Sequence, residues 1–172
     1  MPQKVQAIAG VSASGESDIR SEYPSIAGTW MGRLVGMLCE LIPIKIWGVK
    51  ISYLLFGPLV APIAPLIYLF AKLGGERWAL TNRTLERRAM FGTRLIQSVS
   101  LTEILDITVF QQAGQEFYRA SDLYVLNAKR DPIMLLSGVP QADIFRLTVL
   151  KVRDARQQVE ASLKTIQARQ PA

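Results

Sequence analysis

The sequence predicts an α+β protein in which a curled antiparallel sheet is followed by one long C-terminal helix and preceded by a hydrophobic helical hairpin. Three observations predict this class. The run 51–71 contains no charged residue. After Gly74 and Gly75, apolar residues alternate with polar ones, as in half-buried strands. From about residue 143, apolar residues recur every three, four or seven positions, as in a helix.

Composition separates the beginning of the chain from the rest. The 172 residues are 49% hydrophobic and 20% charged, against about 25% charged in ordinary globular domains. Residues 1–27 are mostly polar and predict a flexible leader. The net charge is +6, and its strongest excess directly follows the apolar run. Basic residues beside a membrane segment mark its cytoplasmic side, so we expect a membrane protein whose folded domain is cytoplasmic.

The apolar run 51–71 has the length of a membrane span, about 20 residues, but contains Pro58, Pro62 and Pro65. Each interior proline removes a helix hydrogen bond, which disfavours a straight span. Two membrane interpretations remain: a kinked single span, and a hairpin with arms 46–56 and 66–73. Lysines on both flanks favour the hairpin, because its two ends face the same leaflet. A hairpin buried in a soluble core is a third alternative.

Region 28–73 also supplies the residues expected to contact lipid, with aromatic side chains at the level of the headgroups. They are Trp47, Tyr53, Leu54, Phe56, Pro58, Pro62, Pro65, Tyr68 and Phe70. Upstream, Trp30, Leu34, Leu38 and Leu41 have helical spacing. They predict a short amphipathic helix that either lies at the interface or packs on the following domain.

The region 76–140 predicts about six short strands joined by tight turns, an antiparallel meander. Thr81 and Asn82 supply turn chemistry between the first two strands. Pro140 then precedes the helix, expected over 143–168. The alternating positions begin at Trp78, Leu85, Leu95, Leu105, Leu123 and Ile133.

The stretch "WALTNRTLERR", followed by Gly92 and Arg94, resembles the signature of the bacterial pleckstrin-homology (PH) domain family. In that family an aromatic-x-Leu-Thr-Asn-Arg-x-Leu segment follows a hydrophobic membrane hairpin. "VSLTEILDITVFQ", "FYRASDLYV" and "LLSGVPQADIFR" resemble later strands and the start of the helix. The resemblance implies a PH-like barrel over 76–150, with 151–172 as a helical extension. Thr84 departs from the family, where a second arginine is usual, and "QQAGQEFYRA" lacks its Gln-Ser opening.

Two functions follow from these features. The first is a membrane-anchored binding module that contacts anionic headgroups or a protein partner. Its candidate ligand-binding residues are Arg77, Arg83, Arg87, Arg88 and Arg94. The resemblance places Arg87, Arg88 and Arg94 nearest to where PH domains contact lipid phosphates. Alternatively, these arginines only follow the rule that basic residues flank membrane segments on the cytoplasmic side.

The second function is assembly through the C-terminal helix. Val152, Val159 and Ile166 are seven residues apart, as in a short coiled coil. The outer half of this helix would pair with a second copy or a protein partner, or remain a solvated extension.

Other functions are disfavoured. With no histidine and one cysteine, the chain has no His-based catalysis, thiolate–imidazole metal site or internal disulfide. We therefore expect no enzyme activity, metal or cofactor. Cys39 is expected to be a buried apolar residue, with palmitoylation as the alternative. Nucleic acid is not expected as a partner, because the basic residues lack interleaved aromatic residues.

Overall fold

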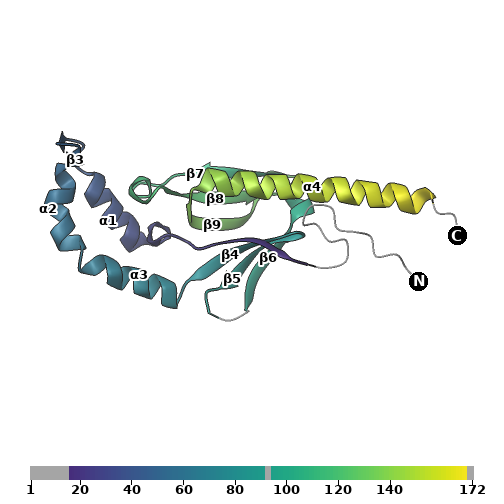
Figure 1. The fold of residues 1–172 in the computed structure, drawn as a ribbon, viewed down its shortest axis with the longest axis horizontal. Coiled ribbons are helices and arrows are strands. Elements are labelled where there is room, and N and C mark those ends of the chain that lie inside the picture. Colours follow the sequence, from purple (N-terminus) through teal and green to yellow (C-terminus); the bar gives the residue numbers. More distant parts are fainter. Residues whose placement is uncertain (1–15, 92–93, 170–172) are drawn as a thin grey trace.

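The computed structural model describes residues 16–91 and 94–169, which form an α+β fold with two larger antiparallel sheets, a third of two short strands, and one long C-terminal helix (Figure 1). The first sheet has the order β1-β4-β5-β6: Asp18–Glu22, Glu76–Thr81, Thr84–Ala89 and Leu95–Ser100. The second has the order β7-β8-β9: Asp106–Phe110, Ala120–Leu126 and Pro132–Pro140. The last helix, α4, is Ala142–Arg169. We call these seven strands and α4 the β-domain.

One hydrophobic core lies between the two sheets and the first half of α4. Leu85 of β5, Leu123 of β8 and Phe145 of α4 are all fully buried members of it. The alternation predicted for 76–140 explains this packing, because every second residue of a strand faces the core. The six predicted strands correspond to β4–β9. The predicted helix 143–168 is α4. Its outer half continues beyond the sheets (Figure 1).

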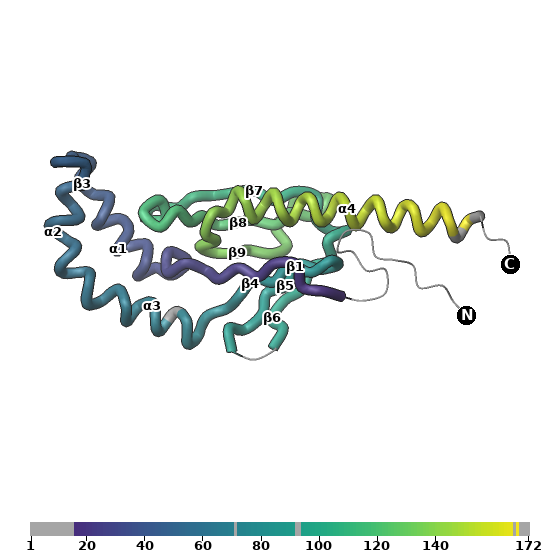
Figure 2. The backbone as a smooth tube through the Cα atoms, viewed as in Figure 1, coloured from purple at the N-terminus to yellow at the C-terminus, as the bar shows by residue number. Residues whose placement is uncertain are grey.

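Strand β1 lies in the region predicted to be a flexible leader. It pairs antiparallel with β4, with Ser21 opposite Ala79 and Glu22 opposite Trp78, and the two run side by side in Figure 2. Its sequence, DIRSE, has a single apolar residue, so it lacks the alternation of apolar and polar residues that predicts a strand. The expected leader does not extend over these residues, and its residues 1–15 lie outside the described part of the chain.

Between β1 and β4 the chain forms what we call the helical arm, residues Trp30–Leu73. A short 3-10 helix, η1 (Ile26–Gly28), leads into it. The arm comprises α1 (Trp30–Glu40), the two-stranded β2–β3 hairpin (Lys45–Ile46 and Val49–Lys50), α2 (Ile51–Val60) and α3 (Ile63–Leu73). Helix α1 starts at Thr29, whose hydroxyl accepts a hydrogen bond from the Gly32 amide at 3.1 Å.

The three prolines interrupt the apolar run as predicted. Pro58 lies inside α2, which ends two residues later. Pro62 is the N-cap of α3, and Pro65 lies in its first turn, where a backbone N–H would have no helical acceptor anyway. Among the described residues, no single helix is long and apolar enough to cross a membrane, although α2 and α3 pass that test as a pair bent by 65°. A close hairpin would reverse the chain direction, and this bend does not.

The arms of the predicted hairpin also differ from the helices observed. Residues 46–50, the start of the predicted first arm, belong to the β2–β3 hairpin instead. Its two-residue turn is Trp47–Gly48, both with positive φ, at 51° and 83°. The second helix starts at Ile63 rather than at 66, because prolines are tolerated at a helix start.

Candidate functional site

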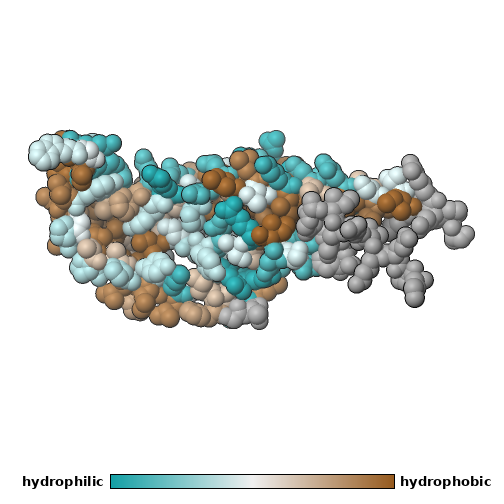
Figure 3. Space-filling view, in the orientation of Figure 1, coloured by the Kyte–Doolittle hydropathy of each residue, from teal (hydrophilic) through white to brown (hydrophobic). Residues whose placement is uncertain are grey.

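The helical arm exposes a large apolar surface on α2 and α3. Leu54 is 65% exposed, Leu59 67% and Phe70 70%. Leu55, Ile63, Leu66, Tyr68, Leu69 and Leu73 are also exposed. The corresponding end of the molecule is brown over both helices in Figure 3. Soluble monomers rarely expose a contiguous apolar patch of this extent, so the surface indicates contact with lipid or protein.

The β2–β3 hairpin extends this surface at the far end of the arm. Trp47, at its turn, is completely exposed. Ile44, Ile46 and Val49 are each at least 44% exposed. An indole at such a tip is typical of side chains that lie at the level of lipid headgroups.

Two of the predicted lipid-contacting residues face the protein instead. The Tyr53 ring packs edge-to-face on Phe117, with centroids 5.5 Å apart, and its hydroxyl is 3.2 Å from Glu40 Oε1, to which it donates. Phe56 is half-buried and faces α1. Leu54, Pro58, Pro62, Pro65, Tyr68 and Phe70 are exposed, as expected.

Helix α1 was predicted to be amphipathic with its stripe at Trp30, Leu34, Leu38 and Leu41. The structure buries a different face: Gly32, Val35, Gly36 and Cys39. The predicted stripe includes Trp30, 65% exposed, and Leu41, 64% exposed. The alternative that α1 packs on the following domain is confirmed for this face, and the larger side chains of the predicted stripe stay outside. Cys39 is 4% exposed, the environment of a small apolar residue, and burial raises its pKa.

Glycines bring α1 against the loop between β7 and β8. A Cβ on Gly36 would lie 2.0 Å from the Gly114 carbonyl oxygen, so no side chain fits there. Gly28 and Gly138 approach each other as closely, since a Cβ on Gly138 would lie 2.4 Å from the Gly28 nitrogen. These backbone contacts hold the root of the arm, where η1 leads into α1, against the second sheet.

A buried polar network reinforces that root. Asp122, 2% exposed, accepts hydrogen bonds at Oδ1 from the Gly138 amide at 2.8 Å and from Gln115 Nε2 at 2.6 Å. Its Oδ2 accepts another from Gln112. Gln112 in turn accepts from Arg33 of α1. A carboxylate supplied with several donors is a stable buried group, and here it ties β8, β9 and α1 together.

The predicted arginines of β4 and β5 divide between the two faces of the first sheet. Arg77 lies opposite Arg88, and Trp78 lies opposite Arg87. Opposed residues share a face and successive residues alternate, so Arg87 is on the face that carries Trp78 and the core. Arg77 and Arg88 are on the outer face.

Carboxylates engage two of these arginines. Arg87 makes a bidentate pair with Glu76, with Nη2–Oε1 at 2.7 Å, and its guanidinium lies 5.8 Å from the Trp78 ring centroid. Arg88 pairs with Glu86 and, at 3.2 Å, with Asp18. The hydrogen bond with Glu86, followed by that with Asp18, raises the pKa of Arg88.

The other two predicted arginines lie apart. Arg83 is in the β4–β5 turn, where its carbonyl accepts from Leu101 N at 2.9 Å. Arg94 is exposed, beyond the opposite end of β5. The four residue-to-residue steps from Arg77 to Thr81 span about 13 Å at 3.3 Å per step, so the five arginines do not form one cluster.

The Thr81–Asn82 turn is structural. Thr81 Oγ1 accepts from the amides of Arg83, at 3.1 Å, and Thr84, at 2.8 Å. Asn82 is fully buried, and its Oδ1 accepts from the backbone of Ser17. Asn82 is not among the residues with positive φ, so its place depends on this pairing rather than on left-handed geometry.

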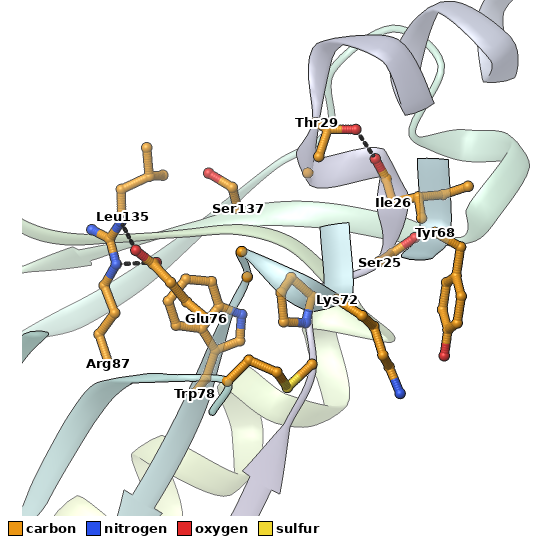
Figure 4. Close-up of a pocket in the computed structure, with 15 residues that line it drawn as sticks. Ser25, Ile26, Thr29, Tyr68, Lys72, Glu76, Trp78, Arg87, Leu135 and Ser137 are labelled. Carbon is orange, nitrogen blue, oxygen red and sulfur yellow. Dashed lines mark hydrogen bonds and ion pairs between the residues drawn. The ribbon is translucent and has the colours of Figure 1, made fainter. Parts of the chain in front are cut away.

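A cavity of about 330 Å³, which we call the head cavity, lies where α3 meets the β-domain (Figure 4). It is lined by residues of η1, the end of α3, β4, β5 and β9, including Lys72, Glu76, Trp78, Arg87 and Ser137. Trp78 is 3% exposed, and its Nε1 has no hydrogen-bond partner among the described residues. In Figure 4 this nitrogen points to the side of Lys72, away from Arg87.

Lys72, near the end of α3, is one of the residues that line the head cavity. Its Nζ lies 5.2 Å from the ring centroid of Tyr68 and 5.7 Å from that of Tyr23. The interaction with the Tyr68 side chain raises the pKa of Lys72, so the ammonium is charged at neutral pH. Sequence reasoning missed Lys72 and Trp78 as site residues, because the cavity forms only where the distant η1 and β9 segments pack beside the junction of α3 and β4.

A second hollow of about 430 Å³, the groove, lies between α1 and the α2–α3 pair. Its lining is entirely apolar and includes Trp30, Leu34, Leu59, Ile63 and Ile67. The described residues contain no group of three or more Cys, His, Asp or Glu that could hold a metal ion.

Comparisons of this chain with protein-family models, curated proteins and solved structures found no match.

Proposed function

We propose that this protein is a membrane-attached binding module, with the helical arm in the lipid surface and a PH-like β-domain on the cytoplasmic side. The observation that carries the proposal is the exposed apolar surface of α2, α3 and the β2–β3 hairpin, from Trp47 to Phe70. Burying a large apolar side chain contributes about 1.5–3 kcal/mol. A bilayer can cover all of this surface at once.

The PH-like assignment is supported by the sequence resemblance and by the element order. Six strands, β4–β9, form two antiparallel groups and are followed by one helix, which is the outline of a PH barrel. The additional strand β1 at the edge of the first sheet departs from that outline. Anionic lipid is the proposed partner of the basic residues, with Arg94 and Arg77 better placed than Arg87 and Arg88, whose charges carboxylates already balance.

Vesicle flotation of the full chain tests the apolar contact. Leu54→Lys with Phe70→Lys should reduce binding to neutral phosphatidylcholine vesicles by at least about 100-fold, because two buried apolar contacts are lost. Leu147→Lys, a change at a residue of α4 that is 53% exposed, should leave binding unchanged. Binding should persist in 1 M salt, where the Debye length is about 3 Å. Failure of the unaltered chain to bind vesicles would refute the proposal.

Self-association through α4 is the second candidate, favoured by one observation. Ile166 is 54% exposed on the part of α4 that extends beyond the sheets. Val152, however, packs on the core, which leaves only Val159 and Ile166 of the predicted stripe for a partner. Ile166→Lys should therefore convert any dimer seen in sedimentation or cross-linking to a monomer. A dimer that survives this change would assign the contact elsewhere.

A further inference from the structure

The head cavity and the groove follow one another along the same two walls. On α3, Ile63 and Ile67 line the groove, while Tyr68 lines the head cavity. On the opposite wall, Trp30 lines the groove and Thr29, the preceding residue, lines the head cavity. Consecutive residues on each wall therefore line the two hollows. We call the groove and the head cavity together the trough, which is apolar at the arm and polar at the β-domain.

The two parts of the trough differ in chemistry. All ten residues that line the groove are apolar, which suits a hydrocarbon chain and nothing charged. The head cavity presents two cations, Lys72 and Arg87, and one carboxylate, Glu76, which already pairs with Arg87. One positive charge remains unbalanced there. Both hollows have volumes in the range of small-molecule sites, about 300–1,000 Å³.

Trp78 adds an independent indication of a ligand at the polar end. Its indole N–H is buried and has no acceptor among the described residues. Buried donors in folded proteins are nearly always paired, so an unpaired one directed toward a cavity indicates an acceptor supplied from outside the chain. A phosphate or carboxylate oxygen at that point would accept from Trp78 and lie on the side of Lys72.

We propose that the trough binds one single-chain lipid with an acidic head, the acyl chain lying in the groove and the phosphate or carboxylate in the head cavity. Trp78 Nε1 donates to the acidic oxygen, and the Lys72 ammonium swings from the tyrosine rings to balance its charge. This goes beyond the proposed function, because it assigns a lipid molecule held within the protein rather than contact with a bilayer.

Native mass spectrometry of the full chain, released from neutral detergent, tests the proposal directly. The probes are lysophosphatidate, palmitic acid, monopalmitoylglycerol and inorganic phosphate. We expect one-to-one adducts with the two acidic lipids, at least about tenfold more than with the uncharged monopalmitoylglycerol, since a hydrogen bond to a charged group is worth about one such factor. A preference between lysophosphatidate and palmitic acid identifies the head as phosphate or carboxylate. Inorganic phosphate alone should not be retained.

Two matched variants test the groove. Leu59 lines it and Leu55, one turn earlier in α2, does not, although both are more than half exposed. Leu59→Trp should fill the groove and reduce the lipid adduct at least about fivefold, the effect of excluding part of the chain. Leu55→Trp should leave it intact. Equal adducts in these two variants would overturn the assignment of the groove.

Two further variants test the head cavity. Trp78→Phe keeps the ring and removes the N–H, and Lys72→Gln removes the charge. Each should abolish the preference for acidic lipid over monopalmitoylglycerol, and a preference retained in both would overturn the assignment of the head. Leu54 and Phe70 line neither hollow, so their lysine variants should lose vesicle binding but keep the adduct. The two proposals therefore fail separately.

Discussion

The β-domain and the helical arm place the same residue type in opposite environments. In the β-domain, Leu80, Leu85, Leu101, Leu123 and Leu136 are fully buried. In the arm, seven leucines are 55–67% exposed: Leu41, Leu54, Leu55, Leu59, Leu66, Leu69 and Leu73. The β-domain therefore completes its own hydrophobic core. The arm is held at its root and leaves its remaining apolar surface exposed.

Two phenylalanines give the largest contrast between the regions. Phe145 of α4 is fully buried in the core, and Phe70 of α3 is 70% exposed. Phe145→Ala should lower the free energy of unfolding by about 3–5 kcal/mol, because it removes buried surface and leaves a cavity. Phe70→Ala should change it by less than about 0.5 kcal/mol. Denaturant unfolding in neutral detergent measures both, and similar losses would mean that the arm is packed as tightly as the core.

The packing of the helical arm on the β-domain should depend on Asp122. Asp122→Asn replaces one carboxylate oxygen by an NH₂ group, which cannot accept a hydrogen bond. Either the Gly138 amide and Gln115, which donate to Oδ1, or Gln112, which donates to Oδ2, then lose their acceptor. The expected loss of stability is about 1–3 kcal/mol, the cost of buried donors left without acceptors. Asp131→Asn, at an exposed residue, should be neutral.

Hydrogen exchange locates the effect of Asp122→Asn. Because Gln112 connects Asp122 to Arg33, amides of α1 should lose protection together with those near Gly138. Loss confined to β8 and β9 would show that the network does not hold the arm.

Two glycines of the arm lie in opposite environments, Gly36 in close packing and Gly57 at an open surface. Gly36→Ala would place a methyl 2.0 Å from a backbone oxygen and must displace α1, whereas Gly57→Ala meets nothing within 4 Å. Gly36→Ala should destabilise the protein by about 1–3 kcal/mol, the usual range for overpacking. Gly57→Ala should stabilise α2 by about 0.5–1 kcal/mol. Thermal unfolding with helix content by circular dichroism distinguishes the two, and a neutral Gly36→Ala would contradict the close approach.

The sequence predicted most of the β-domain because its strands repeat a period that core burial requires. Leu80, Leu85 and Val125 each occupy an alternating position and each is buried. Strand β1 could not be predicted in this way. It lies at the edge of its sheet and is positioned by backbone pairing with β4, which leaves no pattern in side chains.

The candidate site was predicted only in part. Three prolines indicate that a helix breaks, but they do not give the 65° bend, which depends on how α2 and α3 pack against α1. The run of arginines indicates positive charge, but not that Glu76 and Glu86 engage two of them. The head cavity joins residues distant in sequence, such as Ser25 and Ser137. No local pattern carries that information.

The smallest expected effect concerns pH and the packing of α2 on α1. Glu40 pairs with Lys50, and mainly this hydrogen bond lowers the pKa of Glu40 below its ordinary value of 4.5. A carboxyl with a lowered folded pKa stabilises the fold above the unfolded value, and that contribution is lost as the pH falls through the folded value. The protection of the α2 amides, measured relative to their intrinsic exchange rates at each pH, should therefore fall below about pH 4.5.

The contribution of this pair to stability should be small, because both side chains are partly exposed and solvent screens the interaction. Glu40→Gln isolates it from the other carboxylates that titrate in the same range. The variant should exchange faster than the unaltered chain at pH 7 and equally fast at pH 3, while Glu160→Gln, which breaks an ion pair within α4, should not affect α2 at either pH. A difference between Glu40→Gln and the unaltered chain that persists at pH 3 would mean that Glu40 holds the arm by packing rather than by its charge.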